Sequence, residues 1–291
     1  MANMTLKETR FSQDEMEMQY NLRLLRPDYN SAVVPDWEKR SERTRATRRC
    51  TLDLAYGDGP DDRMDVFPSD DPRGPILVYF HGGYWQRGDR KFYSFLGDAF
   101  VDCGITVVLA GYTLCPATSI TGIVGQARAA VAKTILDTDR VPGNRDRLVV
   151  GGHSAGGQIT GMIMATDFST VDPALPVAPV GRGMPMSALF DLGPLRDTTI
   201  NDSLSIDDAE VASMSPMQQP PVGNAPQLVI VGGGETEEFH RQSDNYAALY
   251  QSPDRPVDRY NSGDDDHFDL LNSLADPASP LFARCRDFIL G

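Results

Sequence analysis

Cysteine and histidine are scarce in this chain of 291 residues, which contains four of each. The cysteines are far apart and form no Cys-x-x-Cys pair, which excludes a zinc knuckle or a thioredoxin-type site. Because residues 1–17 are polar and lack the apolar core of a signal peptide, we expect a cytoplasmic protein with reduced thiols. The candidates for a histidine base are therefore few: His81, His153, His240 and His267.

Long apolar runs and positive charge are also lacking. No run approaches the ~18 apolar residues that a membrane helix needs, so we expect no membrane partner. The chain has 27 Lys and Arg against 41 Asp and Glu, and its formal net charge is −14. The negative charge is concentrated in residues 51–291, whose formal net charge is −16. An acidic body repels phosphate groups, so we expect neither a nucleic acid nor an anionic membrane surface as a partner.

The chain does contain an alternation of short apolar runs and helical stretches. The middle runs are continuously apolar, which is typical of strands covered by helices on both faces. The expected strands are Thr51–Tyr56, Met64–Phe67, Ile76–Phe80, Ile105–Ala110, Leu148–Gly151, Gly183–Leu189, Leu228–Gly232 and Val257–Tyr260. The expected helices are 12–48, Arg90–Cys103, Thr118–Asp137, Ser154–Thr166 and Glu238–Gln251. This order predicts an α/β fold with an eight-stranded, mostly parallel sheet in a single domain, 1–291.

Two regions lie outside this alternation. Residues 1–49 form an expected N-terminal helical extension. Segments 168–183 and 193–226 read as loops rich in Pro and Met, and 193–226 is a candidate for a small cap. Because function in such sheets collects at the carboxyl ends of the strands, candidate site residues are sought there.

The first candidate follows the apolar run 148–151. The sequence Gly152-His153-Ser154-Ala155-Gly156 sits between this strand and a helix, which is the context of a nucleophile elbow. The strand and the helix pass so close to the serine that side chains at 152 and 156 would collide. We therefore expect Ser154 to be a nucleophile, with a structural serine in a glycine-rich turn as the alternative.

A second glycine pair follows Ile76–Phe80, in His81-Gly82-Gly83-Tyr84-Trp85. Such a loop supplies backbone N–H groups to an oxyanion hole. The expected donors are the N–H groups of Gly83, Tyr84 and Ala155, with Gly82 as a substitute for one of them. His81 is expected to brace the loop. Tyr84 and Trp85 are either core aromatics or, as we expect, part of a substrate pocket.

A serine nucleophile needs a base, and the chain order of this arrangement is Ser, acid, His. Only His267 both follows Ser154 and lies in a loop after the last strand. Glu235 is the first carboxylate after strand 228–232 and the expected acid, with Glu238 and then Glu237 as alternatives. Asp264, Asp265 and Asp266 show no metal-ligand spacing, so they are interpreted as a solvated turn and no metal site is expected.

Together these motifs resemble the kynurenine formamidase group of α/β-hydrolases over about residues 15–285. The resemblance rests on Gln19-Tyr20-Asn21, His81 to Gln86, Gly152 to Gly157, Ser187 to Leu192, Glu235 to Ser243 and Asp266-His267-Phe268. It places Ser154, Glu235 and His267 at the triad positions, and it implies that a homodimer is a candidate assembly. The family often has Asp where Glu235 stands and commonly has His-Leu where this chain has Gln158-Ile159.

The resemblance implies hydrolysis of a small aryl formamide, such as N-formylkynurenine, through an acyl-enzyme and without a metal or organic cofactor. The expected partner is thus a small-molecule ester or amide. Tyr84, Trp85, Phe190 and Phe268 are expected to line the leaving-group side of the pocket. The alternatives are a carboxylesterase for short-chain or aryl esters, an acyltransferase and a non-catalytic ligand-binding protein of this fold.

Overall fold

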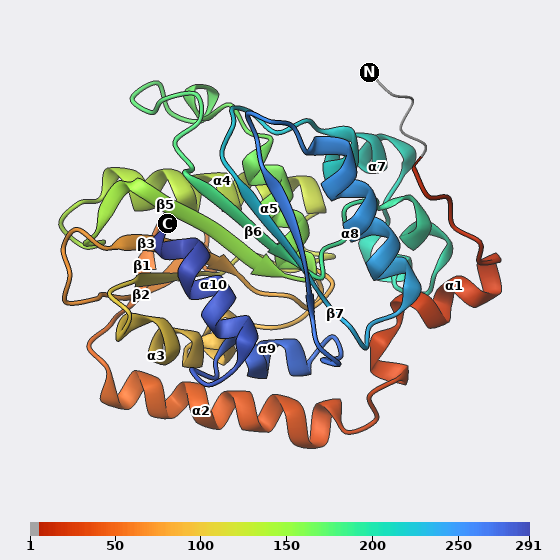
Figure 1. Ribbon diagram of the computed structural model, residues 1–291, viewed down its shortest axis with the longest axis horizontal. Coiled ribbons are helices and arrows are strands. Elements are labelled where there is room, and N and C mark those ends of the chain that lie inside the picture. Colours follow the sequence, from red (N-terminus) through yellow and green to blue (C-terminus); the bar gives the residue numbers. More distant parts are fainter. Residues whose placement is uncertain (1–5) are drawn as a thin grey trace.

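An eight-stranded sheet forms the centre of the protein, whose computed structural model describes residues 6–291 (Figure 1). Its order is β1-β2-β4-β3-β5-β6-β7-β8. Only the pairs β1–β2 and β2–β4 are antiparallel. The strands are β1 (Thr51–Ala55), β2 (Arg63–Phe67), β3 (Pro75–Phe80), β4 (Thr106–Ala110), β5 (Asn144–His153), β6 (Arg182–Met186), β7 (Gln227–Gly232) and β8 (Val257–Ser262). The predicted α/β fold and its mostly parallel sheet are confirmed.

Helices cover both faces of this sheet. On one face, α3 (Phe95–Val101) packs on β4, and α10 (Pro280–Leu290) packs on β3 and on α9 (Asp269–Leu274). On the other face, α4 (Ile120–Leu136) and α5 (Ala155–Met164) pack against β3, and α8 (Glu237–Tyr250) packs against β7 and β8. The central strands are therefore shielded from water on both sides, which explains their continuous apolar sequences.

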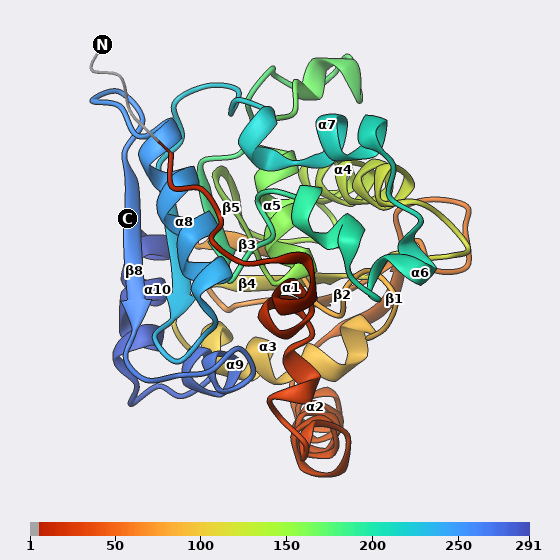
Figure 2. The same cartoon turned by 90° about the vertical axis from the view of Figure 1, so that its right-hand side faces the viewer.

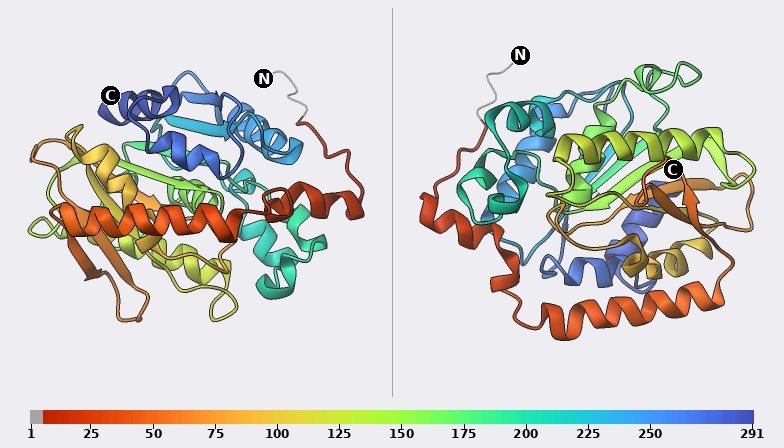
Figure 3. Two further views of the ribbon diagram at one scale, coloured as in Figure 1. Left: turned by 90° about the horizontal axis from the view of Figure 1, so that it is seen from below. Right: turned by 180° about the vertical axis from the view of Figure 1, so that it is seen from behind.

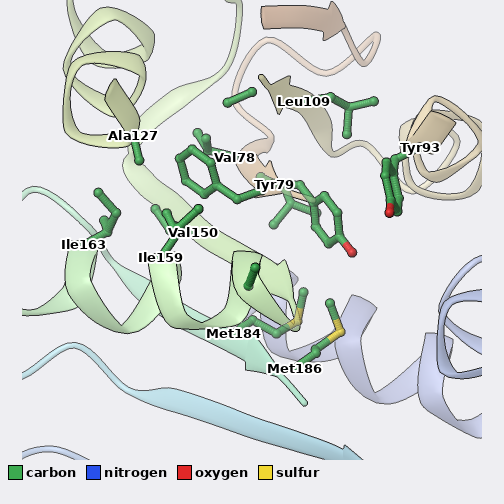
Figure 4. Close-up of a cluster of buried hydrophobic side chains, with 14 of the residues drawn as sticks. Val78, Tyr79, Tyr93, Leu109, Ala127, Val150, Ile159, Ile163, Met184 and Met186 are labelled. Atoms are coloured by element: carbon green, nitrogen blue, oxygen red, sulfur yellow. The ribbon is translucent and has the colours of Figure 1, made fainter. Parts of the chain in front are cut away.

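The main core lies at the middle of the sheet (Figure 4). Val78 of β3 and Val150 of β5 have no exposed surface, and Ile159 of α5 lies against them. The labelled side chains of this cluster are Val78, Tyr79, Tyr93, Leu109, Ala127, Val150, Ile159, Ile163, Met184 and Met186. This packed layer gives rigid support to the loops that follow β3, β5, β6 and β7.

The N-terminal extension, which we expected to be helical over 12–48, consists of several separate helical elements. The structure has α1 (Gln13–Tyr20), a short 3₁₀ turn (Leu22–Leu24), a π turn (Tyr29–Val33) and α2 (Val34–Thr47). The break contains Pro27, which lacks an N–H donor and disfavours a helical conformation of Arg26 before it. Residues 1–5 of the expected extension lie outside the described residues.

The helix α2 lies across the outside of α3, as Figure 3 shows. Arg48, the residue that follows α2, contacts acidic residues of the body: its guanidinium donates to Asp102 at 2.7 Å and to Asp98 at 2.6 Å. The segment 193–226, which we expected to be loop, contains short helices, among them α6 (Asn201–Leu204) and α7 (Asp208–Met214). The helix α1 contacts both α8 and the 3₁₀ turn Gly193–Asp197 (Figure 2). Within residues 6–291 no helix has the length and apolarity needed to span a membrane.

Candidate active site

Ser154 occupies a strained turn between β5 and α5. Its backbone has φ 58° and ψ −117°, and its N–H donates to the carbonyl of Met186 at 2.9 Å. A Cβ at Gly156 would lie 1.9 Å from the carbonyl oxygen of Phe80, and one at Gly152 would lie 2.3 Å from that of Gly156. Both positions therefore require glycine, as the sequence predicted. A non-glycine residue in the left-handed region is a feature that clusters at functional sites.

The loop after β3 lies against this serine. A Cβ at Gly82 would be 3.1 Å from the Cβ of Ser154. Gly83, Tyr84 and Trp85 all have positive φ, and the N–H of Arg87 donates to the carbonyl of Gly83 at 3.1 Å to close the turn. Among the described residues, the N–H groups of Gly83 and Tyr84 donate to no protein acceptor, and Ala155 begins α5, where N–H groups lack helical partners. The three N–H groups that we expected as oxyanion donors thus belong to two segments that adjoin Ser154.

The buried side chain of His81 packs beneath this loop and contacts its backbone. Its Nδ1 lies 2.8 Å from the carbonyl oxygen of Gly82, and the hydroxyl of Tyr112 donates to the His81 carbonyl at 2.8 Å. Its ring stacks on that of Tyr112 with centroids 4.3 Å apart. Burial lowers the pKa of His81 to about 4, so the imidazole is neutral at pH 7. These contacts are those of a structural brace.

His267 meets Glu235 where two neighbouring strands end. The His267 Nδ1 lies 2.7 Å from Glu235 Oε2, and the side chain of Glu235 is fully shielded from solvent. The other oxygen of Glu235 accepts the N–H of Gly232 at 3.1 Å and the hydroxyl of Ser187. A carboxylate bound in this way fixes the orientation of the imidazole and stabilises its protonated form.

The alternative carboxylates have other partners. Glu238 is buried and accepts the Tyr20 hydroxyl at 2.8 Å while it pairs with Arg241. Glu237 is 61% exposed and pairs with Arg10. The structure therefore brings only Glu235 of these three to His267.

Of the three aspartates before His267, Asp264 is exposed in a turn as expected, whereas Asp265 and Asp266 are partly buried and hydrogen-bonded. Asp266 accepts the N–H groups of Phe268 and Asp269 at 2.8 Å each and pairs with Arg26. Asp265 accepts the hydroxyls of Ser262 and Ser273. Their side chains build the loop that carries His267.

Ser154 and His267 line the same cavity, which has about 720 Å³ of atom-free space, part of it open to solvent. Tyr84 and Phe268 line it, as predicted. Trp85 and Phe190 do not, and this corrects the sequence interpretation. Trp85 is fully buried, with its Nε1–H donating to Gln158 at 3.2 Å, and Phe190 stacks on Tyr246 with centroids 4.0 Å apart.

Several wall residues were missed by sequence reasoning. They come mostly from the N-terminal segment, with others from the loop after β3 and the expected cap: Asn21, Leu22, Arg23, Tyr29, Trp37, Gln86, Arg87, Thr199 and Ile200. Apart from Asn21, which lies in a segment that carries the family resemblance, nothing local in the sequence marks the N-terminal residues, because their place depends on how that segment docks. Ser187 was also missed, although it directly follows the carboxyl end of β6, where functional residues gather.

Known proteins resemble this chain in sequence and in structure. A family model described as alpha/beta hydrolase fold matches residues 77–268. Kynurenine formamidase of Danio rerio is 30% identical over 278 residues, which cover 91% of this chain and 92% of the relative. The corresponding protein of Salmo salar is 29% identical over 279 residues, covering 91% and 92%.

Solved structures are also similar to this chain. A Silicibacter protein provisionally described as a thioesterase has a TM-score of 0.80 at 27% identity, with 92% of this chain and 98% of that chain covered. A Pyrobaculum calidifontis esterase, at 18% identity and a TM-score of 0.71 with 94% and 99% covered, shares the fold. With the full-length sequence match to formamidases, these likenesses show that the chain is a hydrolase and belongs to the kynurenine formamidase-like family of α/β-hydrolases.

Proposed function

We propose that the protein is a serine hydrolase that cleaves a small aryl formamide such as N-formylkynurenine, with Ser154 as nucleophile, His267 as base and Glu235 as its orienting acid. The observation that carries the proposal is the 2.7 Å contact of His267 with the shielded Glu235, in the wall of the cavity that Ser154 also lines. The similarity to kynurenine formamidases over 91% of the chain supports the formamide as substrate.

The reaction proceeds in two steps. The hydroxyl oxygen of Ser154 attacks the formyl carbon while the free ring nitrogen of His267 takes the proton. The N–H groups of Gly83, Tyr84 and Ala155 stabilise the negative oxygen that forms, each contributing about 3–4 kcal/mol. His267 then protonates the departing arylamine as the C–N bond breaks. Water, deprotonated by His267, releases formate and restores Ser154.

Replacement of the nucleophile tests this mechanism. We expect Ser154→Ala to lower kcat by roughly 10⁴-fold or more, because no other group supplies the attacking oxygen. Release of the arylamine from N-formylkynurenine and of nitrophenol from p-nitrophenyl acetate measures the loss. Ser213→Ala, on the exposed surface of α7, is the matched control and keeps full activity. Full residual activity of Ser154→Ala at an unchanged melting temperature would contradict the assignment.

A substrate panel separates the formamide from the alternatives. We expect kcat/KM for N-formylkynurenine to exceed that for short p-nitrophenyl esters. The reverse order would identify a carboxylesterase, and transfer of the acyl group to an added alcohol or amine would identify an acyltransferase. A protein that binds these compounds and turns over none of them would be a non-catalytic member of the fold.

A further inference from the structure

The cavity beside Ser154 has an unusual charge for this acidic chain. Its lining contains two arginines, Arg23 and Arg87, and within the described residues it contains no Asp or Glu. The whole chain nevertheless carries a formal net charge of −14. A local positive site inside an acidic body indicates that the cavity receives a negative group.

Neither arginine has a protein counterion. Across residues 6–291, no carboxylate lies within 4.0 Å of the guanidinium of Arg23 or Arg87, and neither side chain donates a hydrogen bond to the protein. Arg26, three residues after Arg23, shows the contrast, since it pairs with Asp266 and Asp269. The hydrogen-bonding capacity of Arg23 and Arg87 is therefore available to a ligand.

The two arginines are placed close to the reacting groups. The N–H of Arg87 donates to Gly83, so Arg87 belongs to the same turn as the expected oxyanion donors. Its side chain lies back over that turn, where a Cβ at Gly83 would be 3.1 Å from Arg87 Cγ. Arg87 is partly buried, and burial together with the positive charge of Arg23 lowers its pKa. A bound anion would relieve this repulsion.

An aromatic wall accompanies the arginines. Tyr29 and Phe268 both line the cavity, with ring centroids 4.6 Å apart, and Phe268 directly follows His267. A planar ring is held well by such side chains. The cavity thus combines a reacting centre, an aromatic wall and a cationic group.

We propose that Arg87 and Arg23 form a carboxylate subsite, so that the enzyme selects aromatic substrates that carry an anionic group on the leaving-group side. This inference rests on the proposed function for the bond that is cleaved. Arg87 is the stronger partner because it is partly buried and fixed by the loop, whereas Arg23 is exposed. N-formylkynurenine, an aryl formamide with a side-chain carboxylate, meets both requirements.

N-formylkynurenine and its methyl ester test the subsite, because the ester has a neutral group in place of the carboxylate and keeps both the aryl formamide and the α-ammonium group. We expect Arg87→Gln to raise KM for the acid at least tenfold more than KM for the ester, since it removes a charge-assisted hydrogen bond. Arg87→Lys keeps the charge and retains part of the selectivity, and Arg23→Gln has a smaller effect. Arg43→Gln, on the exposed side of α2, is the matched control and leaves both KM values unchanged. Equal changes for the acid and the ester would overturn the subsite.

Binding separates this inference from the proposed function. In the Ser154→Ala background, titration calorimetry with kynurenine measures affinity without turnover. We expect the added Arg87→Gln substitution to weaken kynurenine binding at least tenfold. Added salt should weaken kynurenine binding to Ser154→Ala more than to the double variant, because salt screens the charge of Arg87. Equal affinities of Ser154→Ala and of the double variant Ser154→Ala/Arg87→Gln for kynurenine would refute the subsite, whatever bond the enzyme cleaves. A wild-type protein that cleaves no formamide or ester would refute the proposed function, and the titration would still decide on the arginines.

Discussion

At the scale of single residues, backbone strain is concentrated where the central strands end, beside Ser154 and Glu235. Six described non-glycine residues have positive φ, and four of them, Tyr84, Trp85, Ser154 and Ser187, follow the carboxyl ends of β3, β5 and β6. Such conformations cost of order 1–3 kcal/mol each and persist only where the surroundings enforce them. Here the enforcing contacts are the close backbone approaches around Ser154 and the turn closed by Gly83.

Ser187 gives the first prediction at this scale. Its hydroxyl donates to Glu235, so Ser187→Ala leaves the carboxylate that orients His267 with one donor fewer. A hydrogen bond to a charged group contributes about 1.5–3 kcal/mol, and we expect kcat to fall about tenfold while KM stays nearly constant. Steady-state kinetics on N-formylkynurenine measure this split. A rise in KM with unchanged kcat would show that Ser187 acts on substrate binding instead.

The positions of some site residues are determined by local sequence, and the positions of others depend on distant parts of the chain. Ser154 and His267 were located from a turn motif and from chain order, because short-range sterics and topology fix where those side chains stand. Trp85 and Phe190 were misplaced, because the direction of an aromatic side chain on a loop depends on distant partners. Those partners are Gln158 for Trp85 and Tyr246 for Phe190. Arg87 carried no sequence signal, since an arginine without a counterion is recognised only in the folded chain.

At the scale of elements, the strands and the helical character of the N-terminal extension were predictable, but the breaks within the extension were not. All eight expected strands are present. The central ones have the clearest pattern, because a strand that is buried on both faces of a sheet is continuously apolar. The expected helix 12–48 is interrupted near Pro27. Leu22 and Trp37 of this segment are buried, whereas Leu24 and Leu25 beside the break are exposed, so the apolar pattern alone did not reveal where the helix stops.

The junction of β5 and α5 supports a prediction on stability. Gly156→Ala would place a Cβ 1.9 Å from a backbone oxygen of β3, and since backbone cannot move aside cheaply we expect a loss of more than about 3 kcal/mol. Gly125→Ala in α4 is the matched control, because a Cβ there meets nothing within 4 Å. It should stabilise the protein by up to about 1 kcal/mol. Urea denaturation measures both, and equal midpoints for the two variants would refute the steric account of the elbow.

At the scale of the whole molecule, the N-terminal segment (residues 1–50) and the rest of the chain have opposite net charges and form ion pairs with each other. Residues 1–50 are net positive and the remainder is strongly acidic. Arg48 reaches two aspartates of the body, and Arg26 reaches the loop that carries His267. Exposed pairs of this kind contribute little each, so their main effect is to orient α2 and the turn before it against the cavity.

The buried histidines predict how stability depends on pH. Burial lowers the pKa of His81 to about 4, and burial and then the neighbouring His267 lower that of His153 well below its usual value. Between pH 6.5 and 4 both imidazoles bind a proton in the unfolded chain and stay neutral in the folded chain. The free energy of unfolding therefore falls as the pH drops through this window. His81 alone should cost about 2–3 kcal/mol between pH 7 and 4.5. We expect no change from these groups between pH 7 and 8.

Urea denaturation at pH 7 and 4.5 checks this prediction, with wild type compared to His81→Gln. The variant loses stability at pH 7, because the brace behind the Gly82–Gly83 turn is altered. Its further loss at pH 4.5 should be smaller than that of wild type by about 2–3 kcal/mol, since glutamine does not titrate. The difference between the losses of the two proteins cancels the contribution of the carboxylates, which titrate alike in both. An equal loss in the two proteins would mean that His81 accepts its proton in the folded state and that the oxyanion loop tolerates a charge behind it.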